Sequence, residues 1–434
     1  MEPLTVVIDA LTTQGEGIAR VEGKAVFVPY TLPGETWPVR LVQQKKKYDR
    51  ALPAVKTPQK AHPARVEPRC PYFGQCGGCQ LQHIEYQQQQ ILKQQWLEET
   101  FRRIGQIDIE SRPVVASPAW GYRNKVSIPV VELRGGLALA YHQAQAPNRF
   151  VAIAECPIAH PLISQAIPEF TALLNQSGIG VRPSGPKRRP AHLTMQMRHE
   201  GLAVRLDGVK IPAAKREGWV QQCFNQVEAL AFLTISGPGE REDESFSRKG
   251  KEKRGVGWSA FAQVNDAVCK QLYEAIEQLP FPKRGSLLDG YCGRGVLTKR
   301  LAGSFEKVVG VEFDREAIQA ARSAVNKRDF PHLRYEQRTL EGYLKDSPAR
   351  FDALVLNPPR AGLSEEARER LPRLSAEAVA MISCHPAALV RDIKAFTEHG
   401  YRLDHVQPFD MFPQTYHLET TAFLLRESVP VNSD

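Results

Sequence analysis

The chain has 434 residues, more than one hydrophobic core can serve, so two to four domains are expected. Hydrophobic residues make up 42% and charged residues 24%, as is usual for a globular protein. No apolar run approaches the length of a membrane span, and the first residues lack a signal-peptide pattern, so we expect a cytoplasmic protein. The net charge of +9 is compatible with a nucleic-acid partner, although each basic cluster is as readily a solvated loop: Lys45–Lys47, Lys187–Arg189 and Arg248–Arg254.

Residues 1–58 alternate between short apolar runs and turns rich in Gly and Pro. This pattern predicts a small β-barrel, with strands in Leu4–Asp9, Gly15–Arg20, Ala25–Pro29 and Trp37–Val42. The basic and aromatic run Lys45–Tyr48 suits contacts with an RNA backbone and its bases. The module resembles the TRAM domain, an OB-like RNA-binding barrel, in two segments, Gly15–Ala19 and Phe27–Glu35.

A cysteine cluster follows the barrel. Cys70, Cys76 and Cys79 have the spacing C-x5-C-x2-C, and Cys156 stands far along the chain in an Ala-Glu-Cys-Pro-Ile segment. Clustered cysteines in a protein expected in the cytosol indicate a metal centre rather than disulfides. Four thiolates suit either zinc or an iron–sulfur cluster, and the spacing alone does not choose between them.

The central part of the chain, residues 59–255, is predicted to be an α+β domain that carries the cysteine loop. Hydrophobic periodicity predicts helices over Gln82–Arg103 and within Ile158–Asn175. Strand-like runs recur between residues 112 and 250, whereas the charged and apolar-poor segment Gly237–Gly255 is predicted to be a loop.

From residue 256 to 434 strands and helices alternate. The strand Ser286–Asp289 runs into a glycine-rich loop that ends at Gly295, and the next strand closes on Glu312, 23 positions after Asp289. Glycines let a ligand approach the backbone at a helix N-terminus, and an acid at this spacing suits a ribose hydroxyl.

A later strand, Asp352–Leu356, ends at Asn357-Pro-Pro-Arg360. Together with the glycine loop and Glu312, this motif resembles the class I S-adenosylmethionine methyltransferase fold, an α/β Rossmann-like domain. A NAD-binding domain fits less well, because the G-x-G-x-x-G pattern is incomplete. Asn-Pro-Pro is also the motif of amino-methyltransferases, but there an aromatic residue follows where this chain has Arg360.

The apolar run Ala378–Ile382 is predicted to be a buried strand that ends in Ser383-Cys384-His385-Pro386. Carbon 5 of uracil is too weak a nucleophile to attack a sulfonium methyl group unaided, and a thiolate that adds at carbon 6 would activate it. A base must then remove the proton from carbon 5. The chain supplies Cys384 as a candidate thiolate and Glu419, at the start of an apolar strand, as a candidate base.

Over nearly its whole length the chain resembles the RNA uracil-C5 methyltransferase family, in particular members with a TRAM domain and a four-iron cluster that act on 23S ribosomal RNA. The resemblance implies S-adenosylmethionine-dependent formation of 5-methyluridine, with Cys384 as nucleophile and Glu419 as base. It also implies a [4Fe-4S] cluster held by Cys70, Cys76, Cys79 and Cys156, and S-adenosylmethionine bound by Gln263, Tyr291, Glu312 and Asn357. The motifs that carry it, besides the barrel and the cysteines, are Phe261–Asn265, Asp289–Gly295, Asn357–Arg360, Ser383–Pro386 and His417–Glu419.

The chain departs from the family pattern in three places. Asn357 stands where the family usually has Asp, His385 stands where Asn is more usual after the cysteine, and Val296-Leu297 replaces a polar or small residue and an aromatic. Two alternatives therefore remain open: an RNA amino-methyltransferase that uses Asn357-Pro-Pro, and a non-enzymatic RNA-binding iron–sulfur protein. We expect RNA, ribosomal or transfer, as the partner and a monomeric protein.

Overall fold

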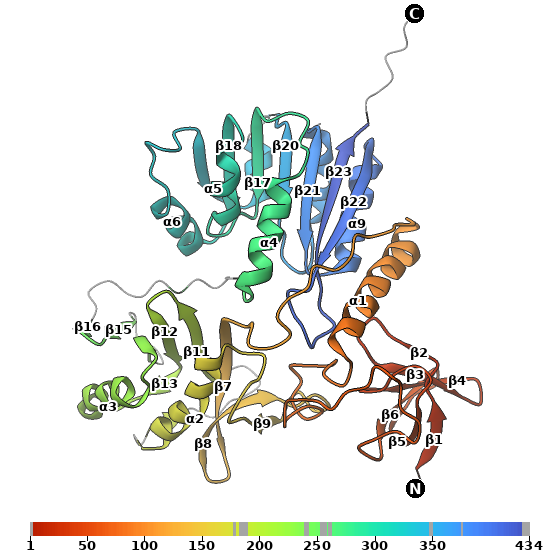
Figure 1. The fold of residues 1–434 in the computed structure, drawn as a ribbon. Helices are drawn as coiled ribbons and strands as arrows, with labels where there is room; N and C mark the ends of the chain where they lie inside the picture. The colour runs from red at the N-terminus through yellow and green to blue at the C-terminus, as the bar shows by residue number, and fades with distance from the viewer. Residues whose placement is uncertain are drawn as a thin grey trace, which may run out of the picture. The chain divides into compact units, whose positions relative to one another are not determined.

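The computed structural model describes residues 3–176, 179–181, 190–237, 243–251, 258, 263–346, 350–374 and 376–427 (Figure 1). The chain divides into two compact units, and each is described by itself. One contains Met1–Gln89, Pro118–Trp258 and Pro413–Tyr416, and the other contains Gln90–Ser117, Ser259–Phe412 and His417–Asp434. In the described part of the chain, no helix has the length and apolar character needed to cross a membrane.

The N-terminal module is a six-stranded sheet in the order β1-β5-β6-β4-β3-β2. Its buried face gathers apolar side chains from alternating positions, among them Val6, Val26, Trp37 and Val39. Tyr48, predicted to be free for base stacking, packs edge-on against Phe27 with 5.6 Å between ring centroids. The strands are β1 (Leu4–Val7), β2 (Ala10–Leu11), β3 (Gly17–Val21), β4 (Lys24–Val28), β5 (Thr36–Gln44) and β6 (Tyr48–Pro53).

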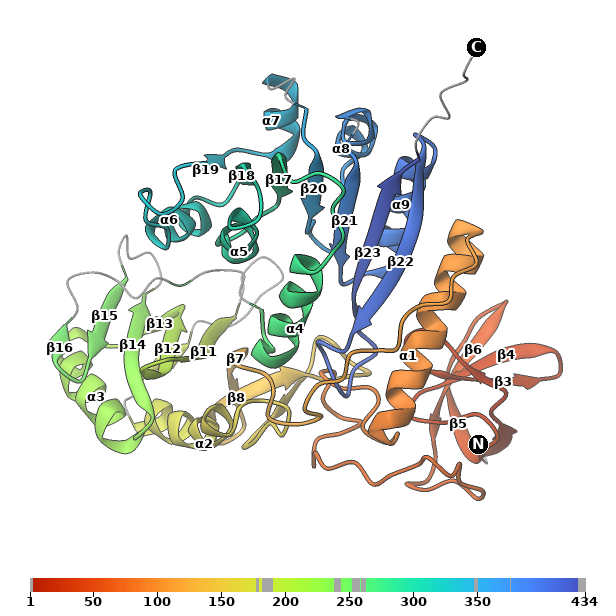
Figure 2. The same cartoon turned by 45° about the horizontal axis from the view of Figure 1, so that its top comes forward.

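The central sheet of the same unit has eight strands in the order β16-β15-β14-β12-β11-β7-β8-β9. The helices α2 (Pro161–Gln176) and α3 (Ala213–Gln226) pack against it, with Phe170 and Trp219 in one apolar core with strand residues such as Leu193 (Figure 2). The strands are β7 (Lys125–Leu133), β8 (Gly136–His142), β9 (Phe150–Ala152), β11 (Ala191–Arg198), β12 (Gly201–Asp207), β14 (Leu230–Ser236), β15 (Glu244–Ser247) and β16 (Gly250–Lys251). Two short strands, β10 (Gly180–Val181) and β13 (Val209–Lys210), pair with each other.

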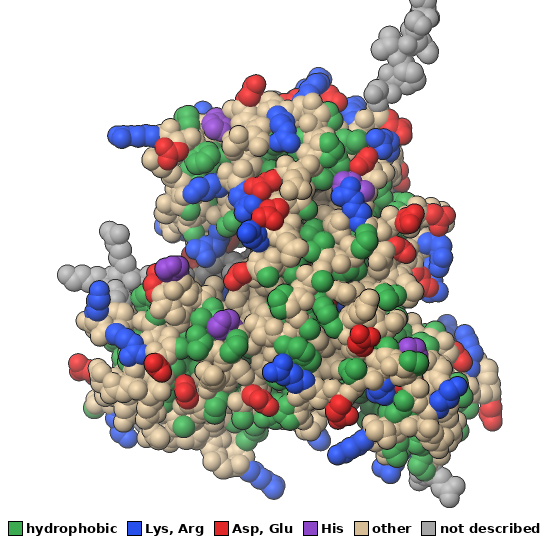
Figure 3. Space-filling view, in the orientation of Figure 1, with side chains coloured by type: hydrophobic (Ala, Val, Ile, Leu, Met, Phe, Trp, Pro, Cys, Tyr) green, Lys and Arg blue, Asp and Glu red, His purple; other side chains and the backbone are tan. Residues whose placement is uncertain are grey.

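Part of the segment expected to be a loop is ordered differently. The prediction for Gly237–Gly255 was wrong for β15 and β16, which form an antiparallel hairpin on the edge of the sheet. Arg248 fixes this hairpin, because its guanidinium donates to the carbonyls of Phe224 and Glu228. The basic run Lys187–Arg189 lies outside the described residues. On the face drawn in Figure 3, Lys and Arg side chains are interspersed with Asp and Glu rather than gathered in one patch.

The second unit is built on a seven-stranded sheet in the order β19-β18-β17-β20-β21-β23-β22, parallel except for β23, which is antiparallel to both its neighbours. Separate apolar cores cover its two faces, one with α4 and α5 and the other with α7, α8 and α9, so the sheet is buried on both sides (Figure 2). The strands are β17 (Ser286–Gly290), β18 (Lys307–Glu312), β19 (Leu333–Gln337), β20 (Ala353–Leu356), β21 (Ala378–Ser383), β22 (Tyr401–Phe409) and β23 (Glu419–Arg426). The helices are α4 (Asp266–Glu277), α5 (Val296–Ala302), α6 (Arg315–Ser323), α7 (Leu340–Asp346), α8 (Glu365–Arg370), the 3-10 turn η2 (Pro372–Leu374) and α9 (Pro386–Thr397).

The helix predicted over Gln82–Arg103 is α1 (Tyr86–Thr100), followed by a π-helical turn, η1 (Phe101–Gly105). We expected it in the central domain, but residues from Gln90 onward group with the second unit. The reason is packing: Leu97 and Phe101 lie in the apolar core of that unit. Lys93 adds a fully buried ion pair, with its Nζ 2.7 Å from Oδ1 of Asp410.

Candidate active site

The carboxyl ends of three neighbouring parallel strands meet at one edge of the second unit's sheet. β17 leads into the glycine loop, β20 ends before Asn357, and β21 ends before Cys384. Strand order reverses between β17 and β20, and open α/β sheets bind their ligands beside such a reversal. The predicted cofactor and nucleophile segments therefore belong to one edge.

Strand register also brings Glu419 to this edge. β23 runs antiparallel to β21, and Ser383 pairs with Thr420. Cys384 directly follows β21, and Glu419 directly precedes Thr420 at the start of β23, so the register brings these two residues to neighbouring positions. Residues 35 positions apart in the chain, both singled out from the sequence, are thus brought together.

Burial dominates the electrostatics of this pair. Glu419 is 5% exposed, and burial raises the pKa of its carboxyl to about 8. Burial also raises the pKa of the Cys384 thiol, the negative charge of Glu419 raises it further, and the guanidinium of Arg360 lowers it. Because the pKa of each group is raised, the Cys384 thiol and the Glu419 carboxyl are both mainly protonated at neutral pH.

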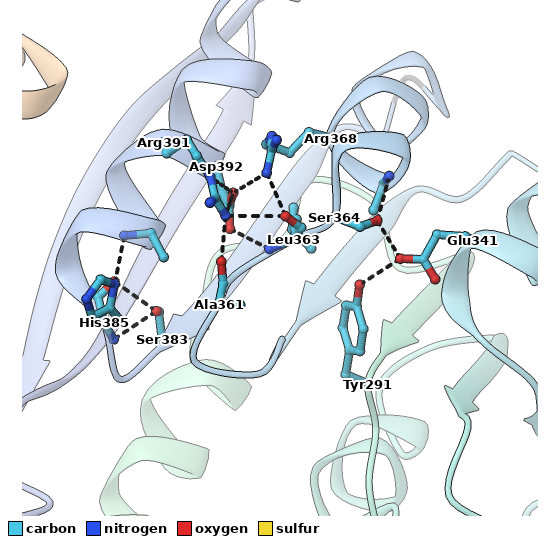
Figure 4. Close-up of polar contacts among 12 residues, drawn as sticks. Tyr291, Glu341, Ala361, Leu363, Ser364, Arg368, Ser383, His385, Arg391 and Asp392 are labelled. Carbon is cyan, nitrogen blue, oxygen red and sulfur yellow. Dashed lines mark hydrogen bonds and ion pairs between the residues drawn. The ribbon is translucent and has the colours of Figure 1, made fainter.

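His385, for which the sequence indicated no role, is the N-cap of α9 (Figure 4). Its Nδ1 accepts a hydrogen bond from the backbone N–H of Ala388 at 3.2 Å, and Pro386 occupies the first turn. Burial, Arg360 and Arg391 lower the pKa of His385, which keeps the ring neutral and able to accept. Asn is also a strong N-cap residue, so His385 replaces the family's usual Asn without loss of the cap.

Two acidic residues, Asp289 and Glu312, accept hydrogen bonds in and next to the glycine loop. Thr298 donates its hydroxyl to Oδ2 of Asp289 at 2.5 Å, and burial raises the pKa of Asp289 to about 7. The carboxylate of Glu312, at the end of β18, accepts the N–H groups of Gly293 at 3.0 Å and Asp314 at 2.8 Å. These two hydrogen bonds fix the Glu312 carboxylate beside the glycine loop.

Two of the other predicted cofactor residues, Tyr291 and Asn357, adjoin this loop. Tyr291 adopts a positive φ of 62°, and its hydroxyl donates to Glu341 at 3.5 Å. Asn357 bonds through its backbone N–H to the carbonyl of Gly290 at 3.2 Å, which ties β20 to the start of the loop. Gln263 is partly buried and stands two residues before Asn265, the N-cap of α4.

In the first unit, the four predicted cysteine ligands line one cavity of about 320 Å³. Burial raises the pKa of Cys79 to about 12 and that of Cys156 to about 11, and the charges of the neighbouring thiols raise both further. Cys156 is thus brought to the C-x5-C-x2-C loop despite its distance in sequence. Within the described ranges no group of three or more His, Cys, Asp or Glu is placed to hold a single metal ion.

Known proteins match the chain over almost its full length. Residues 2–51 match the TRAM domain family, and residues 253–341 and 327–427 match the family described as tRNA (Uracil-5-)-methyltransferase. The 23S rRNA (uracil(1939)-C(5))-methyltransferase RlmD of Cronobacter sakazakii is 32% identical over 437 residues, covering 98% of this chain and 97% of that protein. The RlmD of Photorhabdus laumondii is 31% identical over 434 residues, covering 98% and 96%. The chain belongs to the RNA uracil-5-methyltransferase family.

A solved structure extends the agreement to three dimensions. The Pyrococcus abyssi tRNA (uracil-54, C5)-methyltransferase, crystallised with S-adenosyl-L-homocysteine, superposes with a TM-score of 0.71 over 97% of this chain and 100% of that one, at 22% identity. The predicted TRAM module and methyltransferase fold are confirmed, as is the prediction of an S-adenosylmethionine-dependent RNA uracil-5-methyltransferase. The non-enzymatic alternative is not supported.

Two residues near the site of this RNA uracil-5-methyltransferase escaped the sequence reasoning. Phe313, directly after Glu312, is 71% exposed, so it offers an apolar face beside the predicted ribose acid. Arg360 was judged only as a poor substitute for an aromatic residue, yet its charge acts on both Cys384 and His385. An apolar residue after a strand-terminal acid was a usable signal, whereas the effect of Arg360 depends on how a turn folds.

Proposed function

We propose that the enzyme forms 5-methyluridine in RNA, with Cys384 adding to carbon 6 of the target uracil and Glu419 removing the proton from carbon 5. The observation that supports the proposal is the register of β21 and β23, which brings residue 384, directly after β21, to a position next to the buried Glu419 at the start of β23. Both lie at the sheet edge where the glycine loop of β17 ends.

The proposed reaction has three steps: addition of the thiolate, methyl transfer and elimination. The Cys384 thiolate forms a carbon–sulfur bond at carbon 6, and the electron pair of the 5,6 double bond moves toward carbon 5 and oxygen 4. S-adenosylmethionine supplies the methyl group as a sulfonium, which carbon 5 attacks. The Glu419 carboxylate then takes the proton from carbon 5, the double bond forms again, and the thiolate leaves. A carboxyl whose pKa is about 8 is a matched base for this step near neutral pH.

For the methyl donor we propose five contacts from the chain. Glu312, held by two backbone N–H groups, suits the ribose hydroxyls, and Phe313 beside it suits the adenine ring. Tyr291 and Asn357 adjoin the glycine loop and suit the amino-acid end of the donor, and Gln263, two residues before the N-cap of α4, is the remaining proposed contact.

Incubation of the protein with 5-fluorouridine-substituted RNA and S-adenosylmethionine tests the chemistry, because fluorine at carbon 5 cannot leave as a proton. The wild type should form a covalent protein–RNA adduct, and Cys384→Ala should form none. Undiminished adduct in Cys384→Ala would overturn the proposal. Methylation that survives the loss of Cys384 and appears as an N-methylated base would instead favour the Asn357-Pro-Pro alternative.

We propose ribosomal RNA as the substrate, with 23S rRNA favoured, acted on by a monomer in the cytoplasm. The relatives of highest identity named above are 23S rRNA uracil methyltransferases, and they cover the TRAM module as well as the catalytic domain. Transfer RNA is the competing substrate, since the protein of like fold acts on tRNA. Mass mapping of both RNA classes after incubation with the enzyme decides between them.

We also propose that Cys70, Cys76, Cys79 and Cys156 hold a [4Fe-4S] cluster. Four thiols around one cavity of about 320 Å³ fit this group. A zinc ion bound by four thiolates is the competing centre. Iron and sulfide analysis of anaerobically purified protein should find four of each, and Cys79→Ser should lose them. Stoichiometric zinc without sulfide would contradict the proposal.

A further inference from the structure

One tyrosine side chain of the second unit occupies space that two glycines leave open. Gly310 lies inside β18, and its φ is not positive, so backbone conformation alone does not require glycine there. A Cβ at Gly310 would lie 2.8 Å from Cδ1 of Tyr335. A Cβ at Gly295, the last residue of the glycine loop, would overlap the Tyr335 hydroxyl. Glycine inside a strand often marks the close approach of another group, and here that group is the ring of Tyr335.

Tyr335 reaches the glycine loop from β19, the edge strand of the sheet. It pairs with Gly310 of β18, and β18 separates it from β17, which leads into the loop. The Tyr335 side chain is buried in one apolar cluster with Ile318 and Ala321 of α6, and Cys292 of the loop packs against the same cluster. Packing therefore holds the ring between α6 and the loop.

The Tyr335 hydroxyl gives the loop a hydrogen bond from outside itself. It donates to the carbonyl oxygen of Gly295 at 3.1 Å, and burial raises the pKa of Tyr335, so the hydroxyl keeps its proton. The same carbonyl accepts the backbone N–H of Lys299, in α5, at 2.9 Å. Earlier in the loop, the N–H of Cys292 donates to the carbonyl of Val311 at 3.1 Å. The tyrosine thus anchors the end of the loop, where α5 begins.

We propose that Tyr335 is a positioning residue: it holds the loop Gly290–Gly295 in the conformation that binds the methyl donor. The role rests on the proposed function, in which this loop and its neighbours contact S-adenosylmethionine. A loop with three glycines has many accessible backbone conformations. When only a fraction of the molecules have the binding conformation, the measured affinity falls by that fraction. An anchor that is absent from the loop's own sequence therefore adjusts how tightly the donor binds.

Tyr335→Phe tests the anchor, because it keeps the buried ring and removes only the hydroxyl. Calorimetric titration of the full-length protein with S-adenosyl-L-homocysteine, without RNA, should give a Kd about fivefold higher than that of the wild type. In turnover assays the KM for S-adenosylmethionine should rise by about the same factor, whereas the KM for RNA should not change.

Hydrogen exchange of the ligand-free protein measures the loop directly. The amides of Cys292, Gly293 and Gly295 are all hydrogen-bonded in the structure. In Tyr335→Phe they should exchange about fivefold faster, while the amides of β20 and β21 keep their wild-type rates, because only the loop opens more often.

Tyr401→Phe is the matched control. The Tyr401 hydroxyl is also buried and donates to a backbone carbonyl, that of Ala376, at 2.8 Å. This bond lies at the start of β22 and just before β21, away from the carboxyl ends of the strands where the glycine loop lies. Tyr401→Phe should therefore cost similar stability but leave both the affinity for S-adenosyl-L-homocysteine and the exchange of the loop amides unchanged.

Unchanged loop exchange or unchanged affinity in Tyr335→Phe would each overturn the inference. Equal effects of Tyr335→Phe and Tyr401→Phe would overturn it as well, since they would reflect a general loss of stability. A wild-type protein that does not bind S-adenosyl-L-homocysteine would refute the proposed donor site itself. Wild-type binding with an unaffected Tyr335→Phe would refute only the role of the tyrosine.

Discussion

The buried ion pair between Lys93 and Asp410 offers the sharpest test of what holds the catalytic unit together. Both side chains are fully buried, Nζ lies 2.7 Å from Oδ1, and Nζ also donates to the carbonyl of Phe412 at 3.1 Å. At this distance and an effective dielectric constant of about 20 the attraction is about 6 kcal/mol, which the cost of removing both charges from water largely offsets. The ion pair therefore contributes little net stability, whereas removal of one partner is costly because it leaves the other charge buried and unpaired.

Lys93→Met should lower the free energy of unfolding by about 3–5 kcal/mol, because it leaves the Asp410 carboxylate buried without its cation. The double variant Lys93→Met/Asp410→Leu should recover most of this loss, since neither buried charge remains. Arg103→Met is the matched control: its pair with Glu99 is one helical turn away and exposed, so its loss should cost less than about 0.5 kcal/mol.

Urea unfolding followed by circular dichroism measures these three variants and the single variant Asp410→Leu on one scale. A cost for Lys93→Met no larger than that of the exposed control would refute the reasoning, because it would mean that water reaches Asp410. A double variant as unstable as the sum of its single variants would refute it as well, since the two charges would then act independently. Recovery in the double variant would show that α1 is tied to β22 by complementarity of charge rather than by packing alone.

Three further outcomes are expected at the active site. Glu419→Gln should accumulate a covalent adduct with unmodified RNA after methyl transfer, seen as a slow band on denaturing gels, because nothing removes the proton from carbon 5; free product at the wild-type rate would exclude Glu419 as the base. The pKa of Glu419 in the folded protein, about 8, exceeds the usual carboxyl value, so the free energy of unfolding should fall as pH rises from about 4.5 to 8. Glu419→Gln should therefore melt at a higher temperature than the wild type at pH 8.5 but not at pH 4.5. His385→Ala should cost about 1 kcal/mol of stability by removing the α9 cap, whereas His385→Asn should cost little; equal losses would argue against capping.

Much of the catalytic unit could be predicted because its signals are local. The strand at Ala378–Ile382, the loop after Ser286–Asp289 and the acid Glu312 are each read from a short run of residues, and the structure has strands and a loop at these places. The pairing of Cys384 with Glu419 follows less directly, since it depends on β23 inserting antiparallel between β21 and β22. From the sequence, only the chemistry of the proposed reaction indicated that these two residues act together.

What could not be predicted depends on long-range packing. The strand Tyr401–Phe409 has a register shift between Leu403 and His405, which breaks its alternation of apolar and polar residues. The helix α1 joins the second unit through Lys93, a residue type that is usually exposed to solvent. The role of His385 as a cap and the effect of Arg360 on the thiol both require the fold around them. Capping by His is uncommon enough that spacing alone does not reveal it.

The charged groups around Asn357 explain why Asn rather than the family's usual Asp suits this position. Asp289, Glu312 and Glu419 already bring three carboxyl groups to this edge of the sheet, and burial holds two of them, Asp289 and Glu419, partly protonated near neutral pH. A fourth carboxylate on β20, the strand between the glycine loop and Cys384, would raise the pKa of the thiol further. An amide at Asn357 keeps a hydrogen-bonding group there without that charge. In this chain the departure from Asp therefore acts in the same direction as Arg360, toward the thiolate that the proposed reaction requires.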